Sequence, residues 1–264
     1  MARVTRFAPS PTGPLHLGHA FAALTAAARA SGSVDRFLVR IEDLDRTRCR
    51  PAYEAAIFDD LHWLGLEWQE PVLRQSTRHA AYQRAIDHLS AQGLTYHCTC
   101  SRADIRAALS APQGPDGPVY PGTCRDQGHS TGALRLHIAK ATAHLPDLSF
   151  VDLDRLHRFN PRQLADDIIL YRHGEGFAYH LAVVVDDAFQ DITEVTRGDD
   201  LLPSTPLQVT LQHLLGLPTP TYHHHRLILD DHGKRLAKRD DARARAVYRA
   251  EGATPQDIRH LIGL

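Results

Sequence analysis

The first fifty residues constrain the fold more strongly than any other part of the chain. Residues 3–8 have β-like character, and the next six residues hold three prolines and a glycine that forbid regular structure. Residues 17–30 are rich in Ala and Leu and predict a helix, and residues 33–45 predict a strand that ends in acidic side chains. Strand, loop, helix and strand in this order make the βαβ unit of a parallel sheet. We therefore expect an α/β fold of the Rossmann-like class.

The middle of the chain changes character twice. Residues 51–66 and 78–93 space their apolar groups three and four apart, which predicts two helices. Residues 94–132 then combine clustered cysteines with prolines and glycines, and here we expect a small, irregular insertion with its own stabilisation. Short β-like pieces follow as far as residue 160.

A second α/β stretch begins near Pro161. Within it, residues 191–198 predict a strand. Ser204 and Thr205 then offer an N-cap before Pro206 in the first turn, which predicts a helix that begins there.

Net charge limits the kinds of partner that the chain can hold. Thirty Lys and Arg stand against 31 Asp and Glu, which excludes binding of nucleic acid through an overall positive charge. A local basic face remains possible, since residues 223–249 carry eight Lys or Arg and four Asp. No apolar run is long enough for a membrane span and no signal peptide begins the chain, so we expect a cytoplasmic protein without a membrane partner.

The loop between the first strand and helix is suited to phosphate binding. Backbone amides at the start of a helix can face a phosphate, and His16 and His19 are spaced to point the same way. From the loop alone, a tight turn with two incidental histidines is the other interpretation.

Three of the four cysteines lie close together in the sequence. Cys98, Cys100 and Cys124 would supply three thiolates, whereas tetrahedral zinc needs a fourth ligand. Spacing leaves three candidates for it, which are His97, Tyr120 and His129. Three buried or free cysteines without a metal are the alternative. Cys49 stands apart in the basic run RTRCRP, and the sequence assigns it no role.

Four segments carry a family resemblance. RFAPSPTGPLHLGHAF, residues 6–21, resembles the HIGH motif of class I aminoacyl-tRNA synthetases in the form of the glutamyl and glutaminyl branch. RIEDLDRTR, the stretch FAYHLAVVVDDAFQDITEVTRGDDLLPSTPLQVTLQHLLG and the loop GKRLAKRDD follow in the family order. That last loop resembles the KMSKS loop, in which Lys238 matches the second lysine. Arg235 and Ala237 depart from the pattern.

The resemblance implies a glutamate pocket whose chemistry fits that amino acid. Glutamate carries two carboxylates and one ammonium group, so its pocket needs cations and one anion. By resemblance, Glu42 takes the α-ammonium group, and Arg6 or Arg197 holds the side-chain carboxylate. The implied pocket residues are Arg6, Phe7, Ala8, Pro9, Ser10, Glu42, Tyr179 and Arg197.

The resemblance also implies an ATP site and a structural zinc site. His16, His19 and Lys238 are implied as catalytic residues; with Gly18 they would bind ATP, which we expect to arrive with Mg²⁺. The pattern CxC…YPGTC resembles the zinc site of glutamyl-Q tRNA(Asp) synthetases and selects Tyr120 as the fourth ligand. We expect one zinc ion per chain, stapling the insertion.

The length after the lysine loop indicates which branch of the family the chain resembles. Only 25 residues follow Arg239, so we expect no anticodon-binding domain. The resemblance then implies activation of L-glutamate by ATP and its transfer to the queuosine base of tRNA(Asp), by a monomer. A truncated glutamyl-tRNA synthetase charging tRNA(Glu) and a non-catalytic RNA-binding paralogue are the alternatives.

The expected domain organisation has four parts. Residues 1–93 are expected to form the first half of the catalytic domain, and residues 94–160 the insertion with the zinc site and RNA contacts. Residues 161–220 are expected to form the second half of the catalytic domain, and residues 221–264 the KMSKS-like loop with a helical C-terminal segment.

Overall fold

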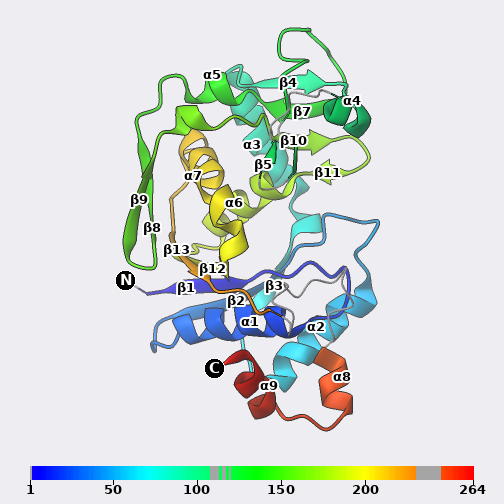
Figure 1. The fold of residues 1–264 in the computed structure, drawn as a ribbon, viewed down its shortest axis with the longest axis vertical. Helices are drawn as coiled ribbons and strands as arrows, with labels where there is room; N and C mark the ends of the chain where they lie inside the picture. The colour runs from blue at the N-terminus through cyan, green and yellow to red at the C-terminus, as the bar shows by residue number, and fades with distance from the viewer. Residues whose placement is uncertain (1, 108–112, 115–116, 119, 230–244) are drawn as a thin grey trace. The chain divides into compact units, whose positions relative to one another are not determined.

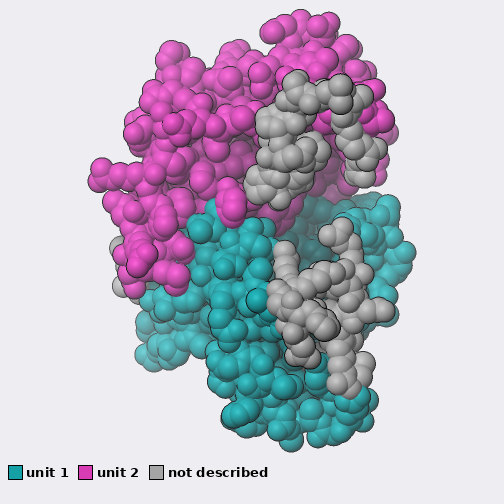
Figure 2. Space-filling view, viewed as in Figure 1, with its two compact units in different colours: residues 1–77, 191–202, 220–264 teal, residues 78–190, 203–219 magenta. Residues whose placement is uncertain are grey.

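The computed structural model describes residues 2–107, 113–114, 117–118, 120–229 and 245–264. The chain forms two compact units, coloured separately in Figure 2. Unit 1 comprises residues 1–77, 191–202 and 220–264, and unit 2 comprises residues 78–190 and 203–219. The four-part division expected from the sequence stays a prediction.

A βαβ unit opens unit 1, as the sequence predicts. Strand β1 (Val4–Phe7), helix α1 (Leu17–Arg29) and strand β2 (Arg36–Ile41) follow one another, and β1 pairs with β2 in parallel (Figure 1). Apolar side chains of α1 join the core with those of both strands. Five buried or half-buried alanines along α1 let the helix lie close to the sheet.

The parallel sheet of unit 1 extends on both sides of this βαβ unit. Helix α2 (Pro51–Trp63) leads to strand β3 (Gln69–Arg74), which pairs in parallel with β2. On the other side, the Thr193 amide donates to the Val4 carbonyl at 3.0 Å, which brings the start of β12 beside β1.

The remaining elements of unit 1 come from later in the chain. Strand β12 (Glu194–Gly198) pairs in parallel with β13 (Thr221–His225). Two short helices, α8 (Arg245–Ala250) and α9 (Pro255–Ile262), end the chain, and Ile258 and Ile262 of α9 join the same core. Two 3₁₀ turns, η1 (Gln75–Thr77) and η3 (Asp199–Ser204), lead from β3 and β12.

Unit 2 is built around an antiparallel sheet in the order β11-β10-β7-β4. Helix α3 (His79–Ala91) precedes the sheet, and α6 (Tyr179–Phe189) and α7 (Thr205–Leu214) follow it in the sequence. Its strands and other elements are β4 (Thr95–Cys98), α4 (Arg102–Ala107), β5 (Gln113–Gly114), β6 (Gly117–Pro118), β7 (Ala133–Leu136), α5 (Ile138–Thr142), β8 (Leu148–Asp152), β9 (Arg155–Phe159), η2 (Pro161–Gln163), β10 (Ile169–Arg172) and β11 (Gly176–Phe177).

The sequence predicts most of these elements but misses some. The helices expected near residues 51–66 and 78–93 are confirmed as α2 and α3. Strand β3 has no counterpart among the expectations, because it contains a proline and its residues are exposed or half-buried, without the alternation that marks a strand. Ser204 does precede α7, but its side chain makes no capping hydrogen bond, since a 3₁₀ turn runs directly into the helix.

The helices in the described ranges are short or carry charged residues. None of the helices there has both the length and the apolar character needed to cross a bilayer.

Candidate functional site

The loop of residues 9–16 is held by backbone hydrogen bonds to the segment that follows β2. The Glu42 amide donates to the Pro9 carbonyl at 3.0 Å, and the Arg50 amide donates to the Pro11 carbonyl at 3.0 Å. Prolines leave their carbonyls available while removing the competing amide donors. The loop is therefore fixed at the carboxyl end of β1, where ligands of open α/β sheets bind.

His16 and His19 together cap helix α1. The Gly18 amide donates to His16 Nδ1 at 3.1 Å, and the His16 amide donates to His19 Nδ1 at 3.2 Å. The two ring centroids lie 3.7 Å apart. Because each Nδ1 accepts a hydrogen bond, the neutral form of each ring carries its proton on Nε2. The pair thus presents two N–H donors at the start of a helix, an arrangement suited to an anion.

Glycine at position 18 leaves room for the His16 ring in this cap. A Cβ atom there would lie 3.0 Å from His16 Cε1 and 3.1 Å from His16 Nδ1. A larger residue would require the His16 ring to shift by a few tenths of an ångström relative to the amide from which it accepts a hydrogen bond. The spacing of the HLGH segment therefore has a local structural reason.

Two buried arginines come from neighbouring strands of unit 1. Arg6 of β1 is 4% exposed and donates to the Thr196 carbonyl at 3.3 Å. Arg197 of β12 is 6% exposed, and its Nε lies 3.0 Å from Nε2 of the equally buried His224. A buried guanidinium group is suited to binding a carboxylate through two parallel hydrogen bonds.

Glu42 is positioned by a buried cation that the sequence analysis misses. Arg40 of β2 is fully buried, and its Nη2 lies 3.5 Å from Glu42 Oε1. Glu42 itself is half-buried just beyond the strand end. A polar residue inside an apolar strand was the signal that could have indicated this pair.

The other site residues predicted from the sequence lie in three places. Some lie at the end of β1 and in the loop that follows it, one lies in unit 2, and the rest lie outside the described residues. Phe7 and Pro9 are buried, and Ala8 and Ser10 are half-buried beside them. Tyr179 is the first residue of α6 in unit 2 and is 36% exposed. Lys238 and the rest of the KMSKS-like loop, with Arg235 and Ala237, lie outside the described residues.

The three clustered cysteines of unit 2 gather in space. The thiol groups of Cys98, Cys100 and Cys124 lie within 4.8 Å of one another. Cys100 Sγ is 3.5 Å from Cys124 Sγ and 3.7 Å from the Tyr120 hydroxyl. The Tyr120 hydroxyl also accepts a hydrogen bond from the Cys124 amide at 2.7 Å. We call these four residues the cysteine cluster; their donor atoms fit a small, soft cation.

The histidines that compete for the fourth position are placed differently. His97 precedes Cys98 in strand β4, so its side chain points to the opposite face of the sheet. His129 Nε2 lies 3.5 Å from the Thr99 hydroxyl. Tyr120 alone among the three candidates contacts a thiol of the cluster in the described part of the chain.

Protonation within the cluster is uneven. Burial raises the pKa of the Cys100 thiol to about 11 and also raises the pKa of the Tyr120 hydroxyl. Burial opposes ionisation of Cys124 as well, but hydrogen bonds from the Tyr120 hydroxyl, the Thr99 amide and the other thiols lower the pKa of Cys124 to about 6. Without a metal, one thiolate is thus already stabilised at neutral pH by the donors around it.

Two adjacent aspartates from far along the chain support the cluster. Asp166 accepts a hydrogen bond from the Tyr120 amide at 3.0 Å, and the fully buried Asp167 accepts one from Arg125 Nε at 2.6 Å. Arg135 donates to the Asp167 carbonyl at 2.6 Å, and its guanidinium carbon lies 3.8 Å from the centroid of the Tyr120 ring. These contacts fix both ends of the segment that carries Tyr120 and the last cysteine. The sequence signals this support only through the aspartate pair directly before an apolar strand.

Comparison with known proteins decides the family. The sequence profile of tRNA synthetases class I (E and Q), catalytic domain, matches residues 3–264. The chain belongs to this family. The predicted fold class is confirmed as the Rossmann-like, parallel-sheet catalytic domain of a class I synthetase that carries a cysteine cluster.

Individual relatives narrow the comparison within the family. A Rhodobacter capsulatus protein named glutamyl-Q tRNA(Asp) synthetase is 54% identical over 99% of the chain and 100% of its own length. A Nocardia farcinica protein of the same name is 47% identical over 97% of the chain and 82% of its own length.

Solved structures of related enzymes are longer than this chain. A glutamate tRNA ligase from Elizabethkingia meningosepticum, solved in complex with its amino acid, matches with a TM-score of 0.78 and 28% identity over 97% of the chain. The chain spans 59% of that ligase.

Proposed function

We propose that the protein activates L-glutamate with ATP and transfers it to the queuosine base of tRNA(Asp). The observation that carries the proposal is the 54% identity over the whole length of a relative named glutamyl-Q tRNA(Asp) synthetase. The matching family profile supports the first half-reaction, because adenylate formation is the work of the class I catalytic domain.

The buried charges of unit 1 support glutamate as the amino acid. Arg6 and Arg197 are buried cations of neighbouring strands, and Glu42 is a half-buried anion just beyond the end of β2 in the same unit. In our proposal one arginine binds the side-chain carboxylate as a planar fork, and Glu42 binds the α-ammonium group. Arg40 is a positioning residue that holds Glu42.

Adenylate formation needs no protein nucleophile. The α-carboxylate of glutamate attacks the α-phosphate of ATP, and pyrophosphate leaves. Mg²⁺, if it accompanies ATP, would neutralise part of the phosphate charge. His16 and His19 supply N–H donors toward the negative charge that develops, and Lys238 is proposed to close over it. A hydroxyl of the queuosine ring then attacks the adenylate carbonyl, and AMP leaves.

Zinc is the metal proposed for the cysteine cluster. Three thiols and one phenol at these distances match its tetrahedral preference and its affinity for sulfur. The cluster lies in the same short segment as β5, β6 and α4, which have too few apolar residues to form a core of their own. The proposed role is therefore structural, with Cys98, Cys100, Tyr120 and Cys124 as the four ligands.

Pyrophosphate exchange tests the activation step. The protein is incubated with ATP, labelled pyrophosphate and one amino acid, without tRNA. We expect exchange with glutamate and none with glutamine, which lacks the side-chain carboxylate, or with aspartate, whose carboxylate is one methylene nearer the backbone. Absence of exchange with glutamate would favour a non-catalytic RNA-binding paralogue instead.

Charging of tRNA(Glu) is the second candidate function. The likeness to the Elizabethkingia glutamate tRNA ligase favours it, because the two chains share the catalytic fold over nearly all of this chain. The two candidates predict the same exchange reaction and differ only in the tRNA that accepts the label.

A further inference from the structure

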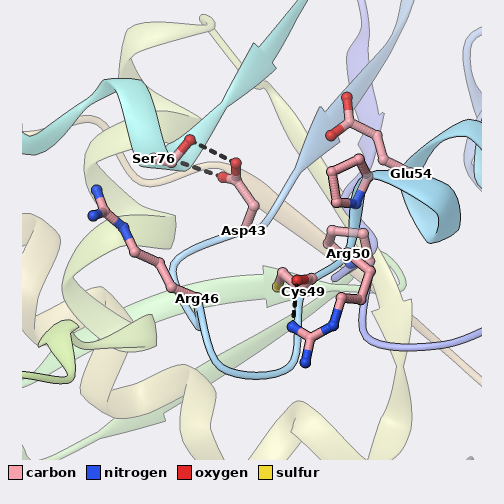
Figure 3. A pocket seen from close by; sticks show the side chains of 8 residues that line it. Asp43, Arg46, Cys49, Arg50, Glu54 and Ser76 are labelled. Carbon is pink, nitrogen blue, oxygen red and sulfur yellow. Dashed lines mark hydrogen bonds between the residues drawn. The ribbon is translucent and has the colours of Figure 1, made fainter.

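An open cavity lies beside the segment that follows β2, all of it within unit 1 (Figure 3). Its volume is about 360 Å³. The residues that line it are Pro11, Asp43, Arg46, Cys49, Arg50, Pro51, Glu54 and Ser76. None of these residues belongs to the glutamate pocket, the ATP site or the cysteine cluster proposed above.

Both carboxylates of the cavity are occupied by protein groups. Asp43 accepts hydrogen bonds from the Ser76 amide at 2.8 Å and the Ser76 hydroxyl at 2.6 Å, as the dashed lines in Figure 3 show. Glu54 Oε1 accepts from Arg74 Nε at 2.8 Å and lies 2.7 Å from Arg74 Nη2. These two anions are therefore poorly placed to bind a cationic ligand.

Both arginines of the cavity keep most of their donors for a ligand. Arg50 Nη1 donates to the neutral Cys49 carbonyl at 2.9 Å, and no carboxylate approaches it in the described part of the chain. The exposed Arg46 side chain has no hydrogen bond or ion pair among the described residues. Glu54 is paired with Arg74, so Arg46 and Arg50 together outweigh the remaining charge of Asp43, and the cavity favours an anionic ligand.

The two guanidinium groups favour a chain of phosphates over a single one. Figure 3 shows Arg46 and Arg50 at opposite ends of the loop, with side chains that extend in different directions. One phosphate would satisfy one of them. A polyanion with repeated phosphates would meet both, and arginine forks suit phosphate oxygens.

We propose that this cavity binds two phosphodiester groups of the RNA substrate through Arg46 and Arg50. This inference rests on the proposed function, which supplies an RNA partner. Pro11 of the cavity wall is part of the loop that ends at His16, so RNA bound in the cavity would contact the same loop that carries the histidines. The contacts position the RNA and do not read its sequence.

Salt dependence of tRNA binding tests this assignment. Fluorescence anisotropy measures binding of tRNA(Asp) to the full chain over a series of KCl concentrations. Each lost contact with single-stranded RNA lowers the slope of log K against log salt by about 0.7. The double variant Arg46→Ala/Arg50→Ala is expected to lose about 1.4 from the slope. Arg46→Lys/Arg50→Lys is expected to keep most of it, because the charge remains.

A matched control separates this site from general charge loss. Arg84 and Arg158 are exposed arginines of unit 2 whose side chains, like that of Arg46, make no hydrogen bond or ion pair in the described ranges. Arg84→Ala/Arg158→Ala removes the same charge elsewhere. Equal slopes for the two double alanine variants, or a wild-type slope in Arg46→Ala/Arg50→Ala, would overturn the proposal.

Other arms distinguish the source of the phosphate. Glutamate-dependent pyrophosphate exchange of Arg46→Ala/Arg50→Ala is expected to keep its KM for ATP, and a raised KM would assign the cavity to ATP instead. Inorganic phosphate at millimolar concentration is not expected to displace tRNA. If the wild-type protein showed no exchange at all, the proposed function would fail. The anisotropy comparison would still decide whether Arg46 and Arg50 bind RNA.

Discussion

The histidine loop of unit 1, residues 9–19, and the cysteine cluster of unit 2 hold their chemistry in different ways. The histidine loop is fixed by backbone hydrogen bonds and by a helix cap made of its own side chains. The cysteine cluster depends on Asp166 and Asp167, which lie more than forty residues beyond Tyr120 and Arg125. The histidine cap is thus local, and the loop before it is held through the backbone of Glu42 and Arg50, whereas side chains from far along the chain support the second site.

This difference predicts how each site responds to substitution. Changing a histidine should remove chemistry and leave the fold of unit 1 nearly intact. Changing a supporting aspartate should loosen the cysteine cluster although no ligand has been touched. Substitutions in the histidine loop and around the cysteine cluster test this difference between the two sites.

Removal of a histidine donor is expected to have the largest effect. His19→Ala should lower the rate of glutamate-dependent pyrophosphate exchange by about 10²–10³-fold. This is the usual effect of removing one hydrogen-bond donor that stabilises charge in the transition state. The substitution also removes the acceptor for the His16 amide, a loss of about 1 kcal/mol in helix capping. Exchange kinetics and thermal unfolding measure the two effects separately.

His19→Asn is the matched control for the cap. Asparagine can accept from the His16 amide but cannot place an N–H where the imidazole Nε2 stands. The melting temperature should recover, and the exchange rate should not. Exchange near the wild-type rate in both variants would show that the histidine loop is only a structural turn.

Loss of the Asp167 carboxylate is expected to weaken zinc binding without touching a ligand. Asp167→Asn should lower the zinc affinity about 10–100-fold, the usual effect of losing an outer partner of a metal site. The reason is that Arg125 and the segment behind it lose their charged anchor. Competition with a chromophoric chelator measures the affinity.

Asp186 provides a control of the same chemistry. It is also fully buried in unit 2, and it accepts from Arg78 at 3.0 Å and from the Tyr82 hydroxyl at 2.6 Å. Asp186→Asn should lower the melting temperature as Asp167→Asn does but leave zinc affinity unchanged. If the two variants lost zinc affinity equally, Asp167 would contribute only to the general stability of the unit and not specifically to the cysteine cluster.

The smallest effect concerns the charge of one thiol in the metal-free protein. The pKa of Cys124 is lowered to about 6, so this thiol should be protonated below pH 5 and ionised above pH 7. Cys100, with its pKa raised to about 11, should stay protonated throughout this range. Thiolate absorbance at 240 nm should therefore rise once between pH 5 and 7. A Cys124→Ser variant that kept this rise would contradict the assignment.

The same contrast explains how much could be predicted from the sequence. The βαβ unit, α2 and α3 were predictable because periodicity and turn residues are local signals. The gathering of the three cysteines was predictable because they are few and closely spaced.

Non-local features were not predictable in the same way. Strand β3 is marked only by its pairing with β2. Arg40 stands out in the sequence as a cation within an apolar strand, but only the structure pairs it with Glu42. The support from Asp166 and Asp167 depends on the pairing of β10 with β7, which no local pattern encodes. Assignments of pocket residues from the family resemblance remain proposals about chemistry.

Labelling of tRNA tests the central claim most directly. Purified tRNA(Asp) from cells that make queuosine and from cells that lack it is incubated with the protein, ATP and [¹⁴C]glutamate. We expect alkali-labile label on tRNA(Asp) only when queuosine is present, and none on tRNA(Glu). Label on tRNA(Glu), or on tRNA(Asp) regardless of queuosine, would contradict the proposed function.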